Sequence, residues 1–221
     1  MIPLRDVIPS RTIPVVTVGL IVVNSLVYLY EFQLWLLDDR LFIHFLRGYG
    51  LVPARFTFTA AFTSMFVHAS WLHVVGNMWF LWIFGDNVED RLGHLRFLFF
   101  YVLCGLVAVL VQTAAAPFTL MPTVGASGAI AGVMGAYFVL YPRSRVLTMI
   151  FPFIFWIIEI PAVFFIGYWF VLQVLSIGAM ADTANTGGVA FWAHVAGFLT
   201  GVLMVFVFRR PERERVEWWN D

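Results

Sequence analysis

A serine set among glycines is the first candidate for chemistry. Ser127 stands in the segment Gly125-Ala126-Ser127-Gly128, just after a loop that contains Pro122. We expect a helix to begin at this serine, so that its backbone N–H is one of the unpaired donors of a helix N-terminus. A nucleophile in that position has a ready site for the oxyanion of an acyl-transfer intermediate. The alternative is close helix packing through small residues, in which the serine has no chemical role.

A second candidate is a histidine in an apolar stretch near the end of the chain. His194 lies within residues 189–208, and Gly197 and Gly201 follow it on the same helix face. The helix after the serine offers a matching face of small residues, at Ser127, Ala131 and Gly135. If the two faces pack, a neutral imidazole reaches the serine hydroxyl and can act as its general base. The alternative is a histidine that serves only as an interhelical hydrogen-bond partner.

A third group of polar residues comes at the start of another apolar stretch. His73 and Asn77 are four residues apart and project from one helix face, where both can donate hydrogen bonds to an oxyanion. If the helix extended back to His68, that residue would lie roughly 140° around the axis from His73. We therefore place His68 in the preceding loop. The histidines do not have a usual zinc spacing, and no acidic or thiol ligand is near them in the sequence. We therefore expect no metal ion.

The chain that carries these residues is too apolar to be a water-soluble domain. Of its 221 residues, 62% are hydrophobic and 12% are charged, and the mean hydropathy is +0.89. A typical soluble domain is about half apolar and a quarter charged. The composition predicts a multi-pass integral membrane protein, folded as one all-α membrane domain over residues 1–221. The net charge is zero, there is no lysine, and no basic patch indicates nucleic-acid binding.

Six apolar segments predict six membrane-spanning helices. Residues 146–177 are too long for one span and contain Pro152 and Pro161, so we divide them into an interfacial piece ending at Glu159 and a span. Residues 38–72 mix aromatic and charged side chains, which is typical of an amphipathic loop in the membrane interface. The expected spans are residues 14–37, 73–88, 95–116, 126–141, 161–177 and 189–208.

The arginines predict how the bundle is oriented in the membrane. With six spans both termini lie on one side, and ten of the thirteen arginines fall on that side. The other three share the loop 38–72. Because cytoplasmic loops carry the excess of basic residues, we expect both termini in the cytoplasm and the protein in the cell inner or plasma membrane. The charged tail 209–221, with Trp218 and Trp219, would lie at the membrane surface.

In combination these motifs resemble those of the rhomboid family of intramembrane serine proteases, in its six-span bacterial and archaeal form. The resemblance covers nearly the whole chain, and the long loop after the first span also fits the family. A further match is Gly85-x-x-x-Glu89-x-x-x-Gly93 at the end of the second span. The main matched motifs are His68-x4-His73-x3-Asn77, Gly125-Ala126-Ser127-Gly128 and Ala193-His194-x-x-Gly197-x-x-x-Gly201.

The resemblance implies a six-transmembrane-helix bundle with a long interfacial first loop, and a serine endopeptidase that cleaves transmembrane segments of other membrane proteins. Ser127 would be the nucleophile and His194 the base, in a dyad without an acidic third member. His73, Asn77 and the backbone N–H of Ser127 would form the oxyanion hole. No cofactor is implied, and the partners would be transmembrane protein substrates and the lipid bilayer.

Structural roles around the site are implied by the same resemblance. His68 would hold the first loop and Glu89 the second. The glycines of the matched motifs, Gly125, Gly128, Gly197 and Gly201, would also be structural. Many relatives have an aromatic residue four positions after the nucleophile, where this chain has Ala131. The sequence therefore identifies no residue that orients the ring of His194.

The fifth expected span is bulky, whereas the fourth and sixth are lined with glycine. Bulky faces pack less closely than small-residue faces in lipid. We therefore expect the fifth span and the loop 178–188 to form a gate through which a substrate helix enters sideways. Trimming Phe165 or Trp169 would then ease entry.

Two other functions stay open at this point. A rhomboid-like protein could bind membrane clients without cutting them, and loss of the serine or the histidine would favour that role. A small transporter could line a polar path with Ser127, Asn77 and His194, although the sequence shows no inverted repeat or pair of broken helices. Labelling of Ser127 by a fluorophosphonate would single out the protease.

Overall fold

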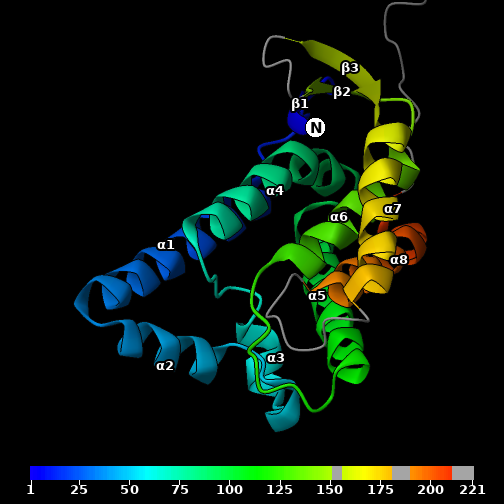
Figure 1. Ribbon diagram of the computed structural model, residues 1–221. Coiled ribbons are helices and arrows are strands. Elements are labelled where there is room, and N and C mark those ends of the chain that lie inside the picture. Colours follow the sequence, from blue (N-terminus) through cyan, green and yellow to red (C-terminus); the bar gives the residue numbers. More distant parts are fainter. Residues whose placement is uncertain (151–155, 181–189, 211–221) are drawn as a thin grey trace, which may run out of the picture.

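A helix occupies each of the six expected spans (Figure 1). The computed structural model of the chain describes residues 1–150, 156–180 and 190–210. Most helix ends lie within two residues of the expected bounds, whereas the second helix runs on to Leu92. The helices are α1 (Val15–Leu37), α4 (Trp71–Leu92), α5 (His94–Ala115), α6 (Ser127–Leu140), α7 (Ala162–Met180) and α8 (Phe191–Phe208).

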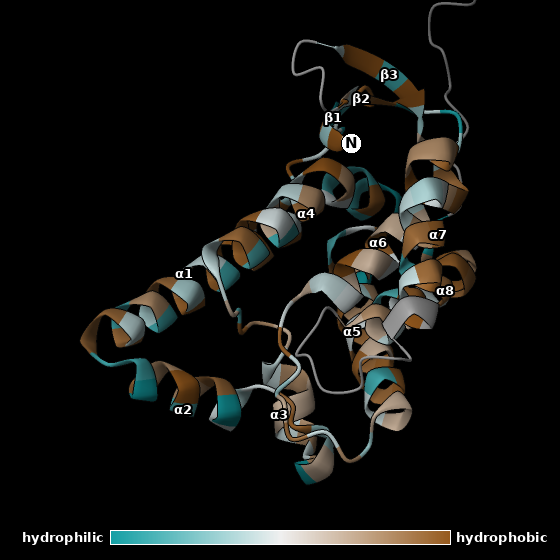
Figure 2. Ribbon diagram, viewed as in Figure 1, coloured by the Kyte–Doolittle hydropathy of each residue, from teal (hydrophilic) through white to brown (hydrophobic). Residues whose placement is uncertain are grey.

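Hydrophobic residues make up much of the bundle helices (Figure 2), and many of the large ones are exposed. α1, α5 and α8 are each long and apolar enough to cross a membrane, and α6 and the Ala162–Ile177 part of α7 are shorter apolar helices. α4 matches them in length, but its last two turns carry Asp86, Glu89, Asp90 and Arg91. Large apolar side chains on these helices face outward, as expected for helices that contact lipid. The helices thus form the membrane bundle that the sequence predicts.

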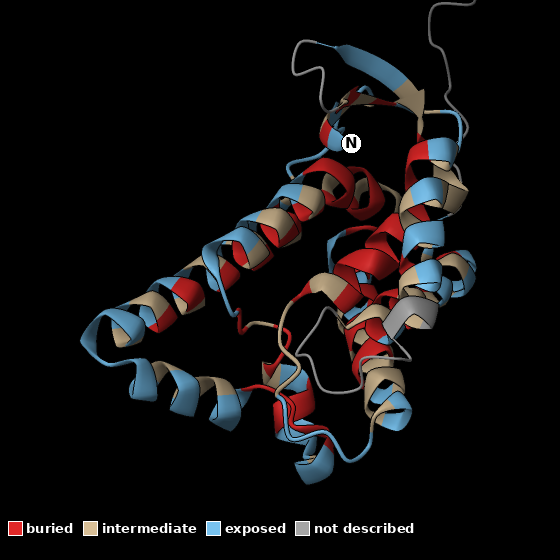
Figure 3. Cartoon of the chain, in the orientation of Figure 1, coloured by how far each residue is buried: buried red, intermediate tan, exposed pale blue. Residues whose placement is uncertain are grey.

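α6 lies inside the bundle, and every residue from Gly128 to Tyr137 is buried (Figure 3). It packs most closely on α8. A Cβ atom added to Gly197 would overlap the carbonyl oxygen of Gly128, and one added to Gly201 would overlap that of Gly132. Both contacts advance by four residues in the same direction, so the two helices run parallel. Glycine at these positions is what lets the backbones approach so closely.

A small antiparallel sheet at one end of the bundle is the main departure from the expected all-α fold (Figure 1). Its strands are β1 (Ile2–Asp6), β2 (Arg145–Met149) and β3 (Ile157–Pro161), with β2 in the middle. The piece expected before Glu159 therefore contains two paired strands. Pairing satisfies the backbone groups where the chain leaves the helices. Apolar runs of five residues do not by themselves distinguish strand from helix.

The long loop between α1 and α4 contains α2 (Asp39–Tyr49), η1 (Pro53–Arg55) and α3 (Phe58–Thr63). α2 buries none of its residues and projects beside the end of α1 (Figure 1). The rest of the loop contacts the segment that precedes α6. Backbone hydrogen bonds join Leu51 and Thr123 in both directions, and the N–H of Gly125 donates to the carbonyl of Ser64 at 2.8 Å. The first loop thus fixes the chain that leads into α6.

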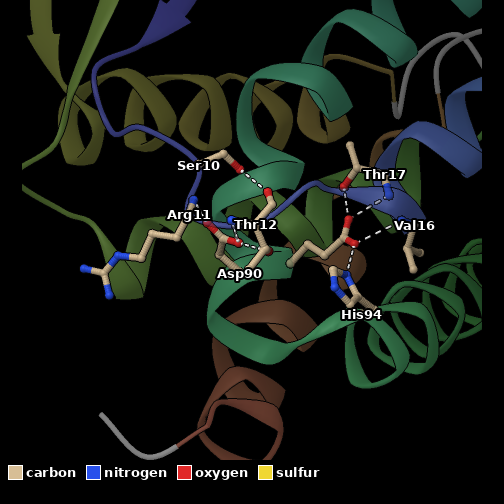
Figure 4. Close-up of polar contacts among 8 residues, drawn as sticks. Ser10, Arg11, Thr12, Val16, Thr17, Asp90 and His94 are labelled. Carbon is tan, nitrogen blue, oxygen red and sulfur yellow. Dashed lines mark hydrogen bonds and ion pairs between the residues drawn. The ribbon is translucent and has the colours of Figure 1, made fainter. Parts of the chain in front are cut away.

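The N-terminal segment is fastened to the end of α4 (Figure 4). Asp90 accepts hydrogen bonds from the backbone N–H groups of Arg11 at 2.5 Å and Thr12 at 3.0 Å, and from the Thr12 hydroxyl. The backbone N–H of Arg210, after α8, donates to the carbonyl of Arg91 at 3.1 Å. The two ends of the described chain therefore lie at the same end of the bundle. Most of the tail 209–221, including Trp218 and Trp219, lies outside the described residues.

Glu89 is fully buried beside this junction. Its carboxylate accepts hydrogen bonds from the backbone N–H groups of Val16 at 3.0 Å and Thr17 at 2.8 Å, and from the Thr17 hydroxyl at 2.7 Å. It also lies 2.6 Å from Nδ1 of His94, at the start of α5 (Figure 4). Glu89 thus contacts the first residue of α5, directly after the second loop, and it also holds the first turn of α1, which the sequence does not predict.

Candidate active site

The serine and the histidine meet at the adjoining ends of α6 and α8. Ser127 is the first residue of α6 and is half-buried, and His194 lies in the first turn of α8 and is buried. The Oγ atom of Ser127 is 2.8 Å from Nε2 of His194. This distance is that of a hydrogen bond, in which the hydroxyl can donate to a bare imidazole nitrogen.

Glycine contacts bring the two helices together, through Gly135 of the expected face and through Gly128 and Gly132 beside that face. The sequence predicts contact through Ser127, Ala131 and Gly135. In the structure Gly128, Gly132 and Gly135 all pack on α8, and Gly135 meets the carbonyl of Phe198. Neighbouring residues of a helix are about 100° apart, so Ser127 stands at the flank of the contact. From there its side chain reaches His194.

His73 and Asn77 converge on the loop just before the serine. Gly125, in that loop, has a φ of +119°. A Cβ atom at this position would lie 2.6 Å from Nε2 of His73 and 3.5 Å from Nδ2 of Asn77. Only glycine combines that backbone conformation with the space that both side chains need. Two side-chain donors therefore lie beside the segment that ends at Ser127.

His68 contacts Asn77, although helical spacing places the two apart. α4 begins at Trp71, so His68 is in the loop and is free of the helix geometry. Its Nδ1 lies 3.2 Å from the carbonyl of Phe66, which can only accept, so Nδ1–H is the donor. Its Nε2 then accepts from Nδ2 of Asn77 at 3.0 Å. This bond fixes the Asn77 amide and leaves its second N–H for another acceptor.

The environment of His68 keeps its ring neutral. The side chain is fully buried, and burial lowers its pKa to about 3, with the neighbouring His73 adding to the effect. Its backbone N–H donates to the carboxylate of Glu31, on α1, at 3.0 and 3.3 Å. Glu31 is itself fully buried. In the sequence, Glu31 could be recognised as a carboxylate in an apolar span. A carboxylate there is costly, so it indicates a functional or structural role.

A glutamine on α7 contacts the other nitrogen of the histidine. Oε1 of Gln173 is 2.8 Å from Nδ1 of His194, and the glutamine is buried. The ring of Trp169 lies beside the imidazole, with centroids 5.9 Å apart. These residues stand where the sequence identifies no orienting group. The available signal is an amide in an otherwise apolar segment, which is a costly placement in a membrane helix.

Comparison with known proteins shows the family of the chain. Residues 55–211 match the family model of the Rhomboid domain. The chain is 27% identical to Rhomboid protein 1, mitochondrial, of Saccharomyces cerevisiae. The match extends over 157 residues, which are 69% of this chain and cover 42% of that protein. Over 170 residues, 73% of the chain, it is 30% identical to Rhomboid-like protein 11, chloroplastic, of Arabidopsis thaliana and covers 55% of it.

A third relative is Rhomboid-like protease 3 of Toxoplasma gondii. The two are 28% identical over 182 residues, which are 79% of this chain and cover 62% of that protein. The chain thus spans less than two thirds of the length of these relatives. The matched region, residues 55–211, contains His68, His73, Asn77, Ser127 and His194. By this match the chain belongs to the rhomboid family.

Proposed function

We propose that this chain is an intramembrane serine endopeptidase that cleaves transmembrane segments of other membrane proteins. The observation that carries the proposal is the 2.8 Å separation of Ser127 Oγ and His194 Nε2. Asn77 and His73 lie beside the same loop and supply the donors that a tetrahedral intermediate needs. Membership of the rhomboid family adds support, since the Toxoplasma relative is named as a protease.

Acylation follows from this geometry. Ser127 Oγ attacks the carbonyl carbon of the scissile peptide, and its proton passes to Nε2 of His194. The carbonyl oxygen becomes an oxyanion, which N–H groups of Asn77, His73 and the Ser127 backbone stabilise. Collapse of the intermediate breaks the C–N bond, and His194 returns the proton to the leaving amine. The acyl group remains on Ser127 as an ester.

Hydrolysis of that ester needs water inside the membrane region. Water attacks the ester carbon and gives a proton to His194, which passes it to Ser127 as the carboxylic acid leaves. The 14 residues of α6 make a helix of about 21 Å, whereas the hydrocarbon core is about 30 Å thick. With Leu140 at the cytoplasmic boundary, Ser127 lies roughly 10 Å below the opposite one. Water can reach that depth from the outer side.

A substrate needs more room than the site offers in this conformation. The recess beside Ser127 has a volume of about 10 Å³, which is room for about one water molecule. A substrate segment therefore enters only after a wall moves, and we propose α7 as that wall. α7 meets α4 through the stacked rings of Phe165 and Phe84, with centroids 6.3 Å apart. The segment must also unwind locally, because helical carbonyls are already hydrogen-bonded.

The proposed orientation places both termini on the cytoplasmic side of the cell inner or plasma membrane. The described ends of the chain lie at one end of the bundle, together with the sheet and the end of α4. Most of the arginines belong to that end. The excess of basic residues on cytoplasmic loops supports this assignment.

Reconstitution tests the proposed function. We expect purified protein in proteoliposomes to cut at least one of a panel of model transmembrane substrates, and the Ser127→Ala variant to cut none. A protein that only binds clients would retain these substrates intact. A transporter would show solute flux that survives Ser127→Ala. Intact substrates throughout, with wild-type protein that is folded, would contradict the proposal.

A further inference from the structure

Gln173 makes a polar side-chain connection between α7 and another helix. Among the described side chains of α7, it is the one that makes a hydrogen bond to another helix, and that bond goes to Nδ1 of His194. Aromatic rings of α7 make further contacts with other helices. Phe170 stacks on Phe198 with centroids 4.4 Å apart, and Phe165 stacks on Phe84. The bond is therefore a specific link between α7 and the proposed base.

The direction of this hydrogen bond follows from its surroundings. Nε2 of Gln173 lies 3.4 Å from the backbone carbonyl of Trp169, which can only accept. The amide NH₂ group therefore faces that carbonyl, and Oε1 faces the histidine. An oxygen there requires Nδ1 of His194 to carry the proton. In a neutral imidazole Nε2 is then bare, and it can accept the proton of Ser127.

We propose that Gln173 is the third member of the catalytic group, a positioning residue that holds His194 in the tautomer and orientation the serine needs. The inference rests on the proposed protease function. It adds a neutral third member to the expected dyad, which has no acidic one. The role matches that of the acidic or amide residue that orients the histidine in other hydrolases.

An amide suits this role in a membrane better than a carboxylate. A charged side chain inside a bilayer is costly unless it is paired. A neutral amide oxygen accepts the Nδ1–H bond without that cost. It keeps accepting when His194 takes up the serine proton, since both ring nitrogens are then donors. The ring thus stays oriented through both proton transfers.

The position of Gln173 on α7 links the base to the wall of the site. The bond is 2.8 Å long, and a donor–acceptor distance of about 3.6 Å no longer makes a hydrogen bond. A shift of α7 by about 1 Å away from α8 therefore releases the ring. If substrate enters past α7, the base is fully oriented only after α7 has returned. Chemistry would then wait for closure around the substrate.

Substitutions at Gln173 test the inference. Gln173→Met keeps the length of the side chain but cannot accept the Nδ1–H bond, whereas Gln173→Glu keeps an acceptor. We expect the methionine variant to lower kcat, and the rate at which a fluorophosphonate labels Ser127, by about ten- to a thousandfold. KM and thermal stability should change little. The glutamate variant should keep at least about a tenth of the wild-type rate.

A second glutamine, which is half-buried, provides the control. Gln112, on α5, accepts a hydrogen bond from the backbone N–H of Ala193 at 3.2 Å and does not bond to the His194 ring. Gln112→Met should therefore leave the labelling rate within about threefold of wild type. In a His194→Ala background, Gln173→Met should have no further effect on kcat.

The outcomes separate this inference from the proposed function. A wild-type protein that cuts substrate, with a Gln173→Met variant that cuts and is labelled equally fast, overturns the inference alone. Equal losses in Gln112→Met and Gln173→Met would also overturn it, because they would show that α8 is merely loosened. Wild-type protein that neither reacts with the probe nor cuts any substrate would overturn the proposed function, and the inference with it.

Discussion

At the scale of single residues, the candidate site depends on polar side chains whose partners fix which atoms donate. The carbonyl of Phe66 sets the tautomer of His68, and His68 in turn sets the amide of Asn77. On the other side of the site, Gln173 accepts from His194, and Nε2 of His194 faces Ser127. In each case the bond leaves one group free for the proposed reaction: an N–H of Asn77 for the oxyanion and Nε2 of His194 for the serine proton.

The donors beside Gly125 give the first prediction. Asn77→Ala should lower kcat by about ten- to a thousandfold, because loss of one oxyanion donor has that effect in other hydrolases. His73→Ala should act similarly, with KM little changed in both. The measurement is the turnover number of each variant and of the wild type with a transmembrane substrate. Full turnover in both variants would show that these residues only hold the helices together.

His68→Ala is the informative comparison with Asn77→Ala. It removes the acceptor of the Asn77 amide and opens a buried space, so it should lower thermal stability as well as turnover. Asn77→Ala should affect turnover more than stability.

At the scale of elements, close approach of α6 and α8 is what brings Ser127 to His194. A methyl group at Gly201 would overlap the carbonyl oxygen of Gly132, so Gly201→Ala must push the helices apart. We expect a loss of about 1–3 kcal/mol in stability and a large drop in activity. Gly19→Ala, on α1, is the control, because nothing lies within 4 Å of an added Cβ there. Thermal unfolding and turnover of the two variants should differ clearly, and equal activity would contradict this account.

Packing of α7 gives the next prediction. Of the two residues expected to control entry, Phe165 and Trp169, only Phe165 gives a clean test. Trp169 lies beside the ring of His194, so its removal would disturb the base as well as the wall. Phe165 is buried against Phe84 of α4, and its neighbour Phe164 is 68% exposed. Phe165→Ala should ease opening and lower KM for a transmembrane substrate, whereas Phe164→Ala should not. The loop 181–188, expected as part of the gate, lies outside the described residues.

A disulfide lock tests the same movement directly. Cysteines at positions 84 and 165, in a Cys104→Ser background, would tie α4 to α7. Oxidation should stop cleavage of a transmembrane substrate while Ser127 still reacts with a small fluorophosphonate. If the locked protein cuts the substrate at the unlocked rate, the gate is elsewhere.

The sequence predicts elements better than it predicts contacts between them. Apolar length is enough to place the six helices, and small-residue spacing is enough to pair the serine with the histidine. The strands β2 and β3 are too short and too apolar to be told from an interfacial helix. Gln173 could not be assigned a partner, because its contact with His194 depends on how α7 and α8 pack. The same holds for Glu31, whose acceptor role depends on the path of the first loop.

At the scale of the whole molecule, the end of the bundle that holds the candidate site is distinct from the end where the N-terminal segment is anchored. Ser127 and His194 lie at the starts of α6 and α8, whereas the N-terminal segment is fastened at the end of α4. Tyr137, near the end of α6, donates to Asp6 of β1 at 2.6 Å. The sheet and the acidic end of α4 therefore hold the helices at one end, and the candidate site lies at the other.

Glu89 gives a prediction about this anchored end. Glu89→Ala would leave several buried donors of α1 without an acceptor, so it should cost at least about 2 kcal/mol of stability. The labelling rate of Ser127 in the protein that remains folded should stay near wild type. Glu159→Ala is the control, because its ion pair with Arg145 is exposed and such pairs contribute about 0–1 kcal/mol. Similar stability of both variants would show that Glu89 does not anchor α1.

The most direct test of the account is the reactivity of Ser127 itself. A fluorophosphonate should label the purified protein at Ser127, as located by mass spectrometry of the labelled peptide. Ser127→Ala should abolish labelling, and His194→Ala should slow it to near background while the protein stays folded. For cleavage of a transmembrane substrate, the double variant should be no worse than either single variant, because the two residues act as a unit. A folded wild-type protein that remains unlabelled, or substantial cleavage by Ser127→Ala, would contradict the account.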